Sequence, residues 1–274
     1  MGAHDPPFRL GELPPVQRLQ TRFGALEYVI SGTGEPAIVL FNGAGVALDG
    51  WRALYPPIET LGTVVAWNRF GMEGSDTVQR VQSGALVVGS VRELLSYTGV
   101  RPPFVLVGHS IGGLYANLFA RLHPDEVAAV LLLEATHPRD HEVLQMDEAQ
   151  LSRALRKVLS LPEWVFRDNL HAEVEAVGHV VHEVDQAGPF PDVPVTVVTG
   201  GVPPPKWIMA EGALQARLEH QRQLAQLSPR SEHVLARRSG HFPQLSEPGV
   251  VIDALARLLT RARPTGASFH APRA

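Results

Sequence analysis

Hydrophobic and polar positions along the chain form two alternating patterns. Short apolar runs bounded by Gly, Pro or Asn are typical of strands buried in a sheet, whereas apolar residues three or four positions apart are typical of helices. Strands are predicted at residues 36–43, 62–71, 102–110, 127–133, 193–201 and 232–240, after a hairpin around Phe23 and Gly24. Helices are predicted within residues 49–61, 81–99, 111–124 and 248–262. This alternation favours a mostly parallel sheet covered by helices on both faces.

One long interval departs from the alternation. Between Thr136 and Pro194 the sequence is charged and helix-favouring, with enough periodicity to be helical. We therefore expect a helical cap at residues 137–192, inserted into an α/β core formed by residues 16–136 and 193–263. Residues 1–15 are predicted to be an N-terminal extension, and residues 264–274 a disordered tail.

Composition excludes several classes of protein. The chain has 274 residues, of which 45% are hydrophobic and 19% charged, so it is long enough to bury a core without disulfides. A net charge of −4 gives no electrostatic footprint for nucleic acid or an anionic membrane. The absence of cysteine excludes disulfides, thiolate metal sites and a cysteine nucleophile. The first residues show neither the basic nor the apolar segment of a secretory signal, so we expect a cytoplasmic protein.

The sequence Gly108-His109-Ser110-Ile111-Gly112 fits the pattern G-x-S-x-G between a predicted strand and a predicted helix. In such a turn the serine backbone is strained, and only small neighbours such as Gly108 and Gly112 leave room for it. The turn exposes the hydroxyl above the sheet, beside a helix N-terminus that stabilises developing negative charge. A chance match is possible in a chain with 25 glycines, but the strand and helix around the motif disfavour it. Ser110 is the predicted nucleophile.

Three segments resemble the α/β-hydrolase superfamily, and the resemblance extends over residues 16–262. They are VLVGHSIGGLYANLFARLHPDEVAAVLLL, VVAWNRFGMEGSD and RRSGHFPQLSEPGVV. In the second segment Asn68 stands where the family commonly has aspartate. The resemblance implies an α/β-hydrolase fold with a mostly parallel, twisted sheet of about eight strands, helices on both faces and a small helical cap. Dehalogenase and epoxide-hydrolase chemistry is disfavoured, because those relatives carry aspartate at the position of Ser110.

A serine nucleophile needs a general base, and His241 is the best candidate among the twelve histidines. It lies in a Gly-His-Phe-Pro loop between the last predicted strand and the final helix, where the superfamily keeps its base. Most other histidines lie in the tails or in the helical insertion. His109 adjoins the nucleophile, but its side chain is expected to point away from Ser110.

The expected oxyanion hole combines two backbone N–H groups. One belongs to Ile111, the residue after the nucleophile. By resemblance the other belongs to Ala44 in the segment FNGAG, where Asn42 replaces the histidine common in the family. Gly43 and Gly45 allow this backbone to turn an N–H inward. Asn42 and Gly43 are also candidates for substrate contact.

The acid of a Ser-His-acid triad is missing from its usual place. Most superfamily members carry it after the strand that here reads VPVTVVTGG, but the chain continues VPPPKW. Glu134 ends the preceding predicted strand, and catalytic groups gather at the carboxyl ends of strands in α/β sheets. The order Ser110, Glu134, His241 also matches the superfamily order. Glu134 is therefore the predicted acid, with Asp140, Asp192 and Glu211 as weaker rivals and a solvated surface residue as the structural alternative.

Apolar side chains suggest the nature of the pocket. Trp51, Met72, Trp164, Phe166, Leu170 and Trp207 are candidates for its wall, although each of these residue types more often belongs to a core. No cluster of charge suggests a strongly charged substrate.

These features predict a serine hydrolase that cleaves a small apolar carboxylic ester or lactone through an acyl-enzyme, with no metal or other cofactor, as a monomer or homodimer. Perhydrolysis or C–C bond cleavage by the same residues remains an alternative. A non-catalytic binding protein on the same scaffold is the alternative from a different class.

Overall fold

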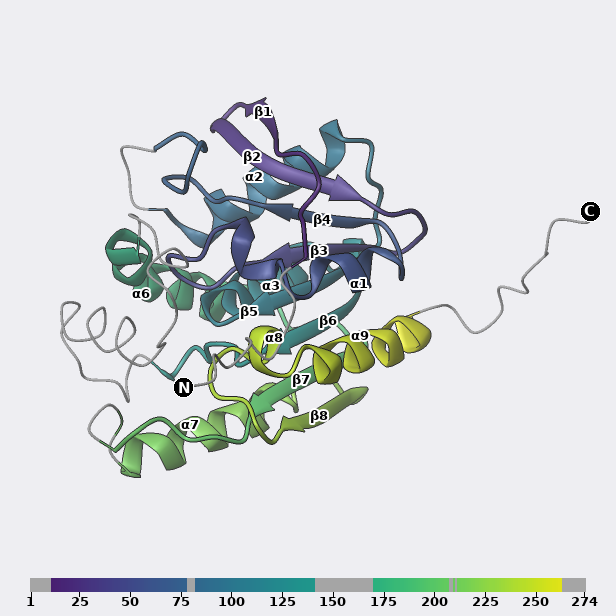
Figure 1. Cartoon of the computed structure of the whole chain (residues 1–274). Helices are drawn as coiled ribbons and strands as arrows, with labels where there is room; N and C mark the ends of the chain where they lie inside the picture. The colour runs from purple at the N-terminus through teal and green to yellow at the C-terminus, as the bar shows by residue number, and fades with distance from the viewer. Residues whose placement is uncertain (1–10, 78–81, 141–169, 207–208, 210, 263–274) are drawn as a thin grey trace, which may run out of the picture.

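The computed structural model describes residues 11–77, 82–140, 170–206, 209 and 211–262. Eight strands form one sheet in the order β1-β2-β4-β3-β5-β6-β7-β8 (Figure 1). The pairs β1–β2 and β2–β4 are antiparallel, and every pair from β4 to β8 is parallel. The strands are β1 (Gln17–Thr21), β2 (Gly24–Ser31), β3 (Ala37–Phe41), β4 (Val64–Trp67), β5 (Phe104–His109), β6 (Val127–Leu133), β7 (Val195–Gly200) and β8 (Ser231–Ala236).

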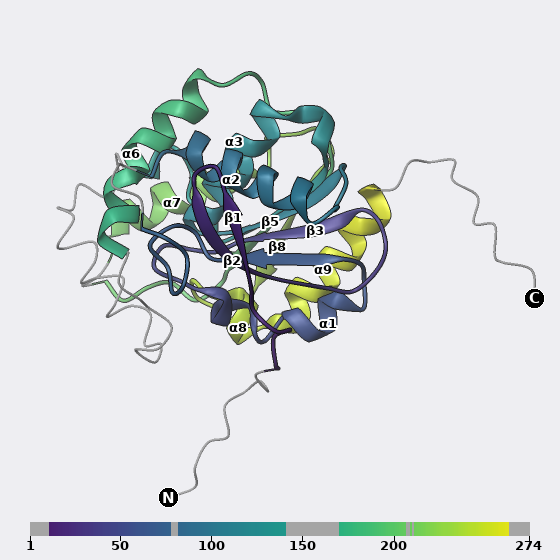
Figure 2. The ribbon, with the colours of Figure 1, turned by 90° about the horizontal axis from the view of Figure 1, so that it is seen from above.

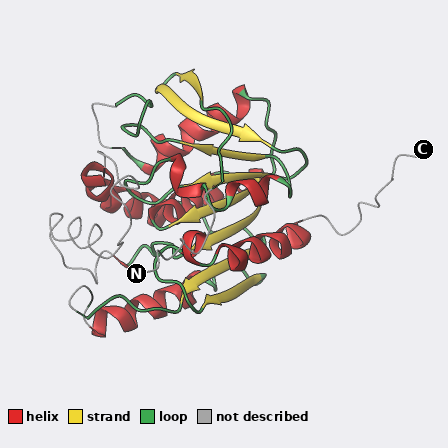
Figure 3. Cartoon of the chain, in the orientation of Figure 1, coloured by secondary structure: helices red, strands yellow, loops and turns green. Residues whose placement is uncertain are grey.

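Helices cover both faces of the sheet (Figures 2 and 3). On one side lie α2 (Gly84–Tyr97), α3 (Ile111–Leu122) and α6 (Leu170–Gln186). On the other lie α1 (Tyr55–Glu59), α8 (Pro243–Ser246) and α9 (Pro248–Ala262). The helix α7 (Glu211–Leu224) follows β7, and the short 3₁₀ helices are η1 (Leu48–Trp51) and η2 (Pro124–Glu126). None of the helices within the described residues is long and apolar enough to cross a membrane.

The central strands are apolar throughout because both faces are covered. Successive side chains of β3 enter different cores: Val39 and Phe41 pack with α2 and α3, while Ile38 and Leu40 pack with α1 and α9. This alternation follows from the two-residue period of a strand. The predicted strands, the hairpin and the mostly parallel sheet are thus confirmed.

The part of the expected cap that the structure describes is a helix of the core layer. Val180, Val181 and Val184 of α6 belong to the same apolar cluster as α2 and α3, and α6 contacts both helices. The helix α6, which lies within the expected cap, therefore packs as part of the layer that covers one face of the sheet, and the division at residues 137–192 stays a prediction. Residues 141–169, the rest of the expected cap, lie outside the described residues, as do the tail from 264 and residues 1–10 of the extension.

The helix α7 was not predicted from the sequence. Its stretch EGALQARLEHQRQL has little apolar periodicity. Only His220, Gln221 and Leu224 are buried, so two of its three buried residues are polar. A helix that buries polar side chains has no apolar stripe for a pattern search to find.

Candidate active site

Ser110 lies at the turn between β5 and α3 with a left-handed backbone. Its φ is +54° and its ψ is −125°, a combination rarely adopted by L-residues. The neighbours leave no room for larger side chains: a Cβ on Gly108 would lie 2.5 Å from the Cα of Gly113. A Cβ on Gly112 would lie 2.1 Å from the carbonyl oxygen of Phe41. Tight packing therefore maintains the strained turn and leaves Ser110 only half-buried.

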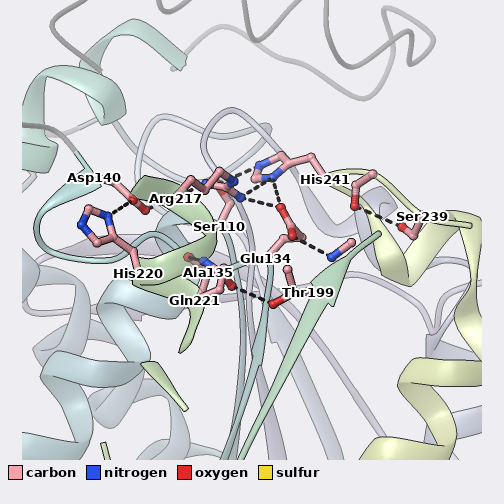
Figure 4. A network of polar contacts seen from close by, with 12 residues as sticks. Ser110, Glu134, Ala135, Asp140, Thr199, Arg217, His220, Gln221, Ser239 and His241 are labelled. Carbon is pink, nitrogen blue, oxygen red and sulfur yellow. Dashed lines mark hydrogen bonds and ion pairs between the residues drawn. The ribbon is translucent and has the colours of Figure 1, made fainter. Parts of the chain in front are cut away.

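His241 contacts Ser110 with one ring nitrogen and Glu134 with the other (Figure 4). Its Nε2 lies 3.2 Å from Ser110 Oγ, and its Nδ1 lies 3.2 Å from Glu134 Oε2. Ser110 follows β5, Glu134 follows β6, and His241 lies in the loop after β8. The structure thus brings the predicted nucleophile, base and acid into one hydrogen-bonded chain at the carboxyl edge of the sheet.

Glu134 is buried and makes four polar contacts with other described residues. Its Oε1 accepts a hydrogen bond from the Gly200 N–H at 2.7 Å, and its Oε2 accepts one from Arg217 at 2.5 Å in addition to facing His241. Its own N–H donates to the Val198 carbonyl at 2.9 Å. Burial by itself raises the pKa of the carboxyl group, but Arg217 and His241 outweigh burial and hold the pKa of Glu134 well below its usual range. The side chain is therefore ionised at neutral pH.

One face of α7 holds the loop that carries Glu134. Arg217, His220 and Gln221 are spaced i, i+3 and i+4, so they project from the same side of the helix. Gln221 donates to the Ala135 carbonyl at 2.8 Å, and His220 Nδ1 lies 2.7 Å from Asp140 Oδ1 (Figure 4). Sequence reasoning missed Arg217, because its role depends on a helix that has no apolar signature.

The three rival acids have other surroundings. Asp140 is buried against His220 and accepts from the His137 N–H at 2.7 Å. Asp192 lies 3.5 Å from the Ser228 hydroxyl, and Glu211 is a largely exposed residue at the start of α7. These contacts of the rival acids do not include His241.

His109 adjoins Ser110 and supports the loop of His241. Its Nε2 donates to the carbonyl oxygen of His241 at 2.7 Å. Burial, then the neighbouring His241, lowers the pKa of His109 to about 3. His109 is therefore neutral at pH 7, with its proton on Nε2.

The segment expected to complete the oxyanion hole lies beside the nucleophile. A Cβ on Gly43 would lie 3.3 Å from Ser110 Cβ and 2.8 Å from His109 Nδ1. The N–H of Ile111 begins α3, and the first N–H groups of a helix have no partner within it. Ala44 follows Gly43 directly, so both expected donors are close to Ser110.

The expected substrate contacts have different outcomes. Trp51 is 1% exposed and packs in the apolar cluster on the α1 and α9 side of the sheet, and its contact with substrate stays a prediction. Asn42 is buried at the carboxyl end of β3. Trp164 and Trp207 lie outside the described residues, as does Phe166. Among the residues that are described, no group of three His, Asp or Glu side chains could hold a metal ion.

A family model described as the alpha/beta hydrolase family matches residues 38–254, which include all of this site. The chain belongs to the alpha/beta hydrolase family. An uncharacterized protein of Mycobacterium tuberculosis is 25% identical to this family member over 92% of this chain and 83% of its own length. A Schizosaccharomyces pombe protein, also uncharacterized, is 39% identical, but the match covers 26% of this chain and 14% of that protein.

Solved structures of two hydrolases have the same fold as this family member. A thermophilic esterase from Thermogutta terrifontis superposes with a TM-score of 0.67 at 17% identity, covering 92% of this chain and 100% of the esterase. An enol-lactonase from Burkholderia xenovorans gives a TM-score of 0.66 at 19% identity, covering 89% of this chain and 100% of the lactonase. At such identities the likeness is one of fold.

Proposed function

We propose that this alpha/beta hydrolase cleaves a small, apolar carboxylic ester or lactone with a Ser110–His241–Glu134 triad and an acyl-enzyme intermediate. The observation that carries the proposal is the position of the His241 ring, whose two nitrogens face the Ser110 hydroxyl and the Glu134 carboxylate at 3.2 Å each. The esterase and lactonase folds noted above are consistent with it.

The first half of the reaction forms an ester on the enzyme. Ser110 Oγ attacks the substrate carbonyl carbon while His241 Nε2 takes the hydroxyl proton. The N–H groups of Ile111 and Ala44 donate to the oxyanion. The tetrahedral intermediate then collapses, and His241 returns the proton to the leaving alkoxide. In a lactone the leaving oxygen stays attached to the acyl chain.

Water completes the cycle. His241 removes a proton from the water that attacks the acyl carbon, and then protonates Ser110 Oγ as the ester bond breaks. In both halves Glu134 orients the ring and stabilises the imidazolium. Its Oε2 accepts from His241 Nδ1 and from Arg217 together, which is possible because a carboxylate oxygen has two lone pairs.

Covalent labelling with a fluorophosphonate probe tests the nucleophile. The wild-type protein is expected to be labelled once per chain at Ser110, and Ser110→Ala is expected to remain unlabelled with the same circular dichroism spectrum. A folded wild-type protein that stays unlabelled would indicate a non-catalytic binding protein and refute the proposal. A panel of p-nitrophenyl esters of increasing acyl length, together with simple lactones, then tests the substrate class.

A further inference from the structure

A buried ion pair lies behind the segment that carries Ala44. Arg69, after β4, and Glu173, on α6, are 2% and 0% exposed in their side chains. Arg69 Nε donates to Glu173 Oε1 at 2.5 Å, and one terminal nitrogen donates to Glu173 Oε2 at 2.9 Å. Paired with two bonds, the guanidinium and the carboxylate fix each other's orientation.

The same pair holds three backbone groups of the segment 42–45. Arg69 donates to the carbonyl oxygens of Asn42 and Gly43, both at 2.7 Å. Glu173 Oε2 accepts from the Gly45 N–H, also at 2.7 Å. Two buried side chains therefore bind the backbone on both sides of Ala44.

These bonds determine the direction of the intervening N–H group. In a trans peptide the carbonyl of one residue and the N–H of the next point in opposite directions. The Gly43 carbonyl points at Arg69, so the Ala44 N–H points away from Arg69. Among the described residues, that N–H donates no hydrogen bond to a backbone carbonyl. The same segment passes beside Ser110, as the position of Gly43 indicates.

We propose that Arg69 and Glu173 are positioning residues that aim the Ala44 N–H at the oxyanion formed on Ser110. The inference rests on the proposed function. Neither residue touches the substrate. They act through the peptide between Gly43 and Ala44, whose rotation would remove one of the two oxyanion donors.

Glu173→Gln tests the proposal, because it preserves the shape of the side chain but removes the charge that pairs with Arg69 and strengthens the hydrogen bond from Gly45. The helix also offers a matched control. Glu183 of α6 likewise accepts from backbone N–H groups of another element, namely Gly84 at 2.6 Å and Ala85 at 3.3 Å at the start of α2. Glu183→Gln therefore loosens the docking of α6 without touching the oxyanion segment.

Steady-state hydrolysis of a p-nitrophenyl ester separates positioning of the oxyanion segment from docking of α6. Loss of one oxyanion donor lowers kcat by about 10²–10³, so misdirection of Ala44 in Glu173→Gln is expected to lower kcat at least about tenfold with KM within about threefold. Glu183→Gln is expected to keep kcat within about twofold, and urea unfolding measures the loss of stability in each variant. The inhibition constant of a trifluoromethyl ketone, which forms an oxyanion on Ser110, should rise by the factor by which kcat/KM falls.

The outcomes distinguish failure of this inference from failure of the proposed function. If the wild type hydrolyses neither an ester nor a lactone, both proposals fail. If the wild type is active and Glu173→Gln keeps the same kcat as Glu183→Gln, the inference alone fails. Should Glu173→Gln not fold, the double variant Arg69→Met/Glu173→Leu decides, since replacing a buried ion pair with apolar residues is often tolerated. A folded double variant with wild-type kcat overturns the inference, and a folded one with kcat reduced at least about tenfold supports it.

Discussion

Arg217 donates a hydrogen bond to the same Glu134 oxygen that faces His241, at 2.5 Å against 3.2 Å. The guanidinium also lies 3.4 Å from His241 Nδ1. A cation is thus in contact with both the acid and the base of the proposed triad. Arg217 keeps the buried carboxylate ionised, but it also makes the site sensitive to any change in the charge of Glu134.

Glu134→Gln is expected to lower kcat by about 10⁴, as amidation of a triad acid does, because a neutral amide no longer stabilises the imidazolium. The change also leaves Arg217 without its closest partner. Breaking a buried pair costs about 3–5 kcal/mol, and here this is an upper limit because Asp140 remains 3.9 Å from Arg217. Ester hydrolysis and urea unfolding measure the two effects.

A second substitution separates catalysis from stability in that experiment. The double variant Glu134→Gln/Arg217→Gln should regain much of the lost stability and none of the lost kcat. Glu211→Gln, at an exposed acid that starts α7, is the control and should match the wild type. A double variant within about tenfold of wild-type kcat would assign the acid role to another carboxylate.

Arg217→Gln is expected to move the acid side of the pH–rate profile to higher pH. Burial raises the pKa of Glu134, and without the guanidinium only His241 opposes it, so the carboxylate is protonated and inactive at a higher pH than in the wild type. Arg222→Gln is the matched control, because Arg222 lies exposed on the same helix and pairs with Glu219 at 3.0 Å. The kcat/KM profile measures the shift, and identical acid limbs in the two variants would contradict the prediction.

Gly112→Ala and Gly178→Ala should change stability in opposite directions. A Cβ at Gly112 would meet the Phe41 carbonyl at 2.1 Å, whereas one at Gly178 would meet nothing within 4 Å. Overpacking at Gly112 should cost about 1–3 kcal/mol or more and reduce activity by displacing the end of β3. Gly178 lies inside α6, where alanine should add about 0.5–1 kcal/mol. Urea unfolding measures the change in the free energy of unfolding of each variant, and equal changes would contradict the packing argument.

His109→Gln is expected to reduce the sensitivity of the fold to acid. The pKa of His109 is about 3 in the folded protein against 6.5 for an unperturbed histidine. Between these values the unfolded chain binds a proton that the folded chain does not, so the free energy of unfolding falls as pH falls. The contribution approaches about 1.4 kcal/mol per pH unit in that window and is absent above it.

Urea unfolding at pH 7 and pH 5 measures this difference. The wild type should lose more stability between the two pH values than His109→Gln does. His179→Gln, at an exposed position on α6, should behave like the wild type. Parallel losses in wild type and His109→Gln would show that His109 is not held in its neutral form.

The amino-acid sequence by itself determined the sheet and the turn that carries Ser110. Continuous apolar runs such as 127–133 identify strands covered on both faces, and G-x-S-x-G between a strand and a helix identifies Ser110, because both signals lie within a few neighbouring residues. The prediction of Glu134 depended on an absence, the lack of any acid in VPPP after β7, and its catalytic role stays a prediction.

Only the tertiary structure decided which charged groups meet. Glu134 lies 107 positions from His241 and 83 from Arg217, and Arg69 lies 104 positions from Glu173. Ser110, Glu134 and His241 meet because the order β5-β6-β7-β8 sets the carboxyl ends of these strands side by side. Local periodicity specifies neither this order nor the meeting of Arg69 with Glu173. The polar helix α7 and the buried pair behind Ala44 carry no apolar pattern, so their roles arise from long-range packing alone.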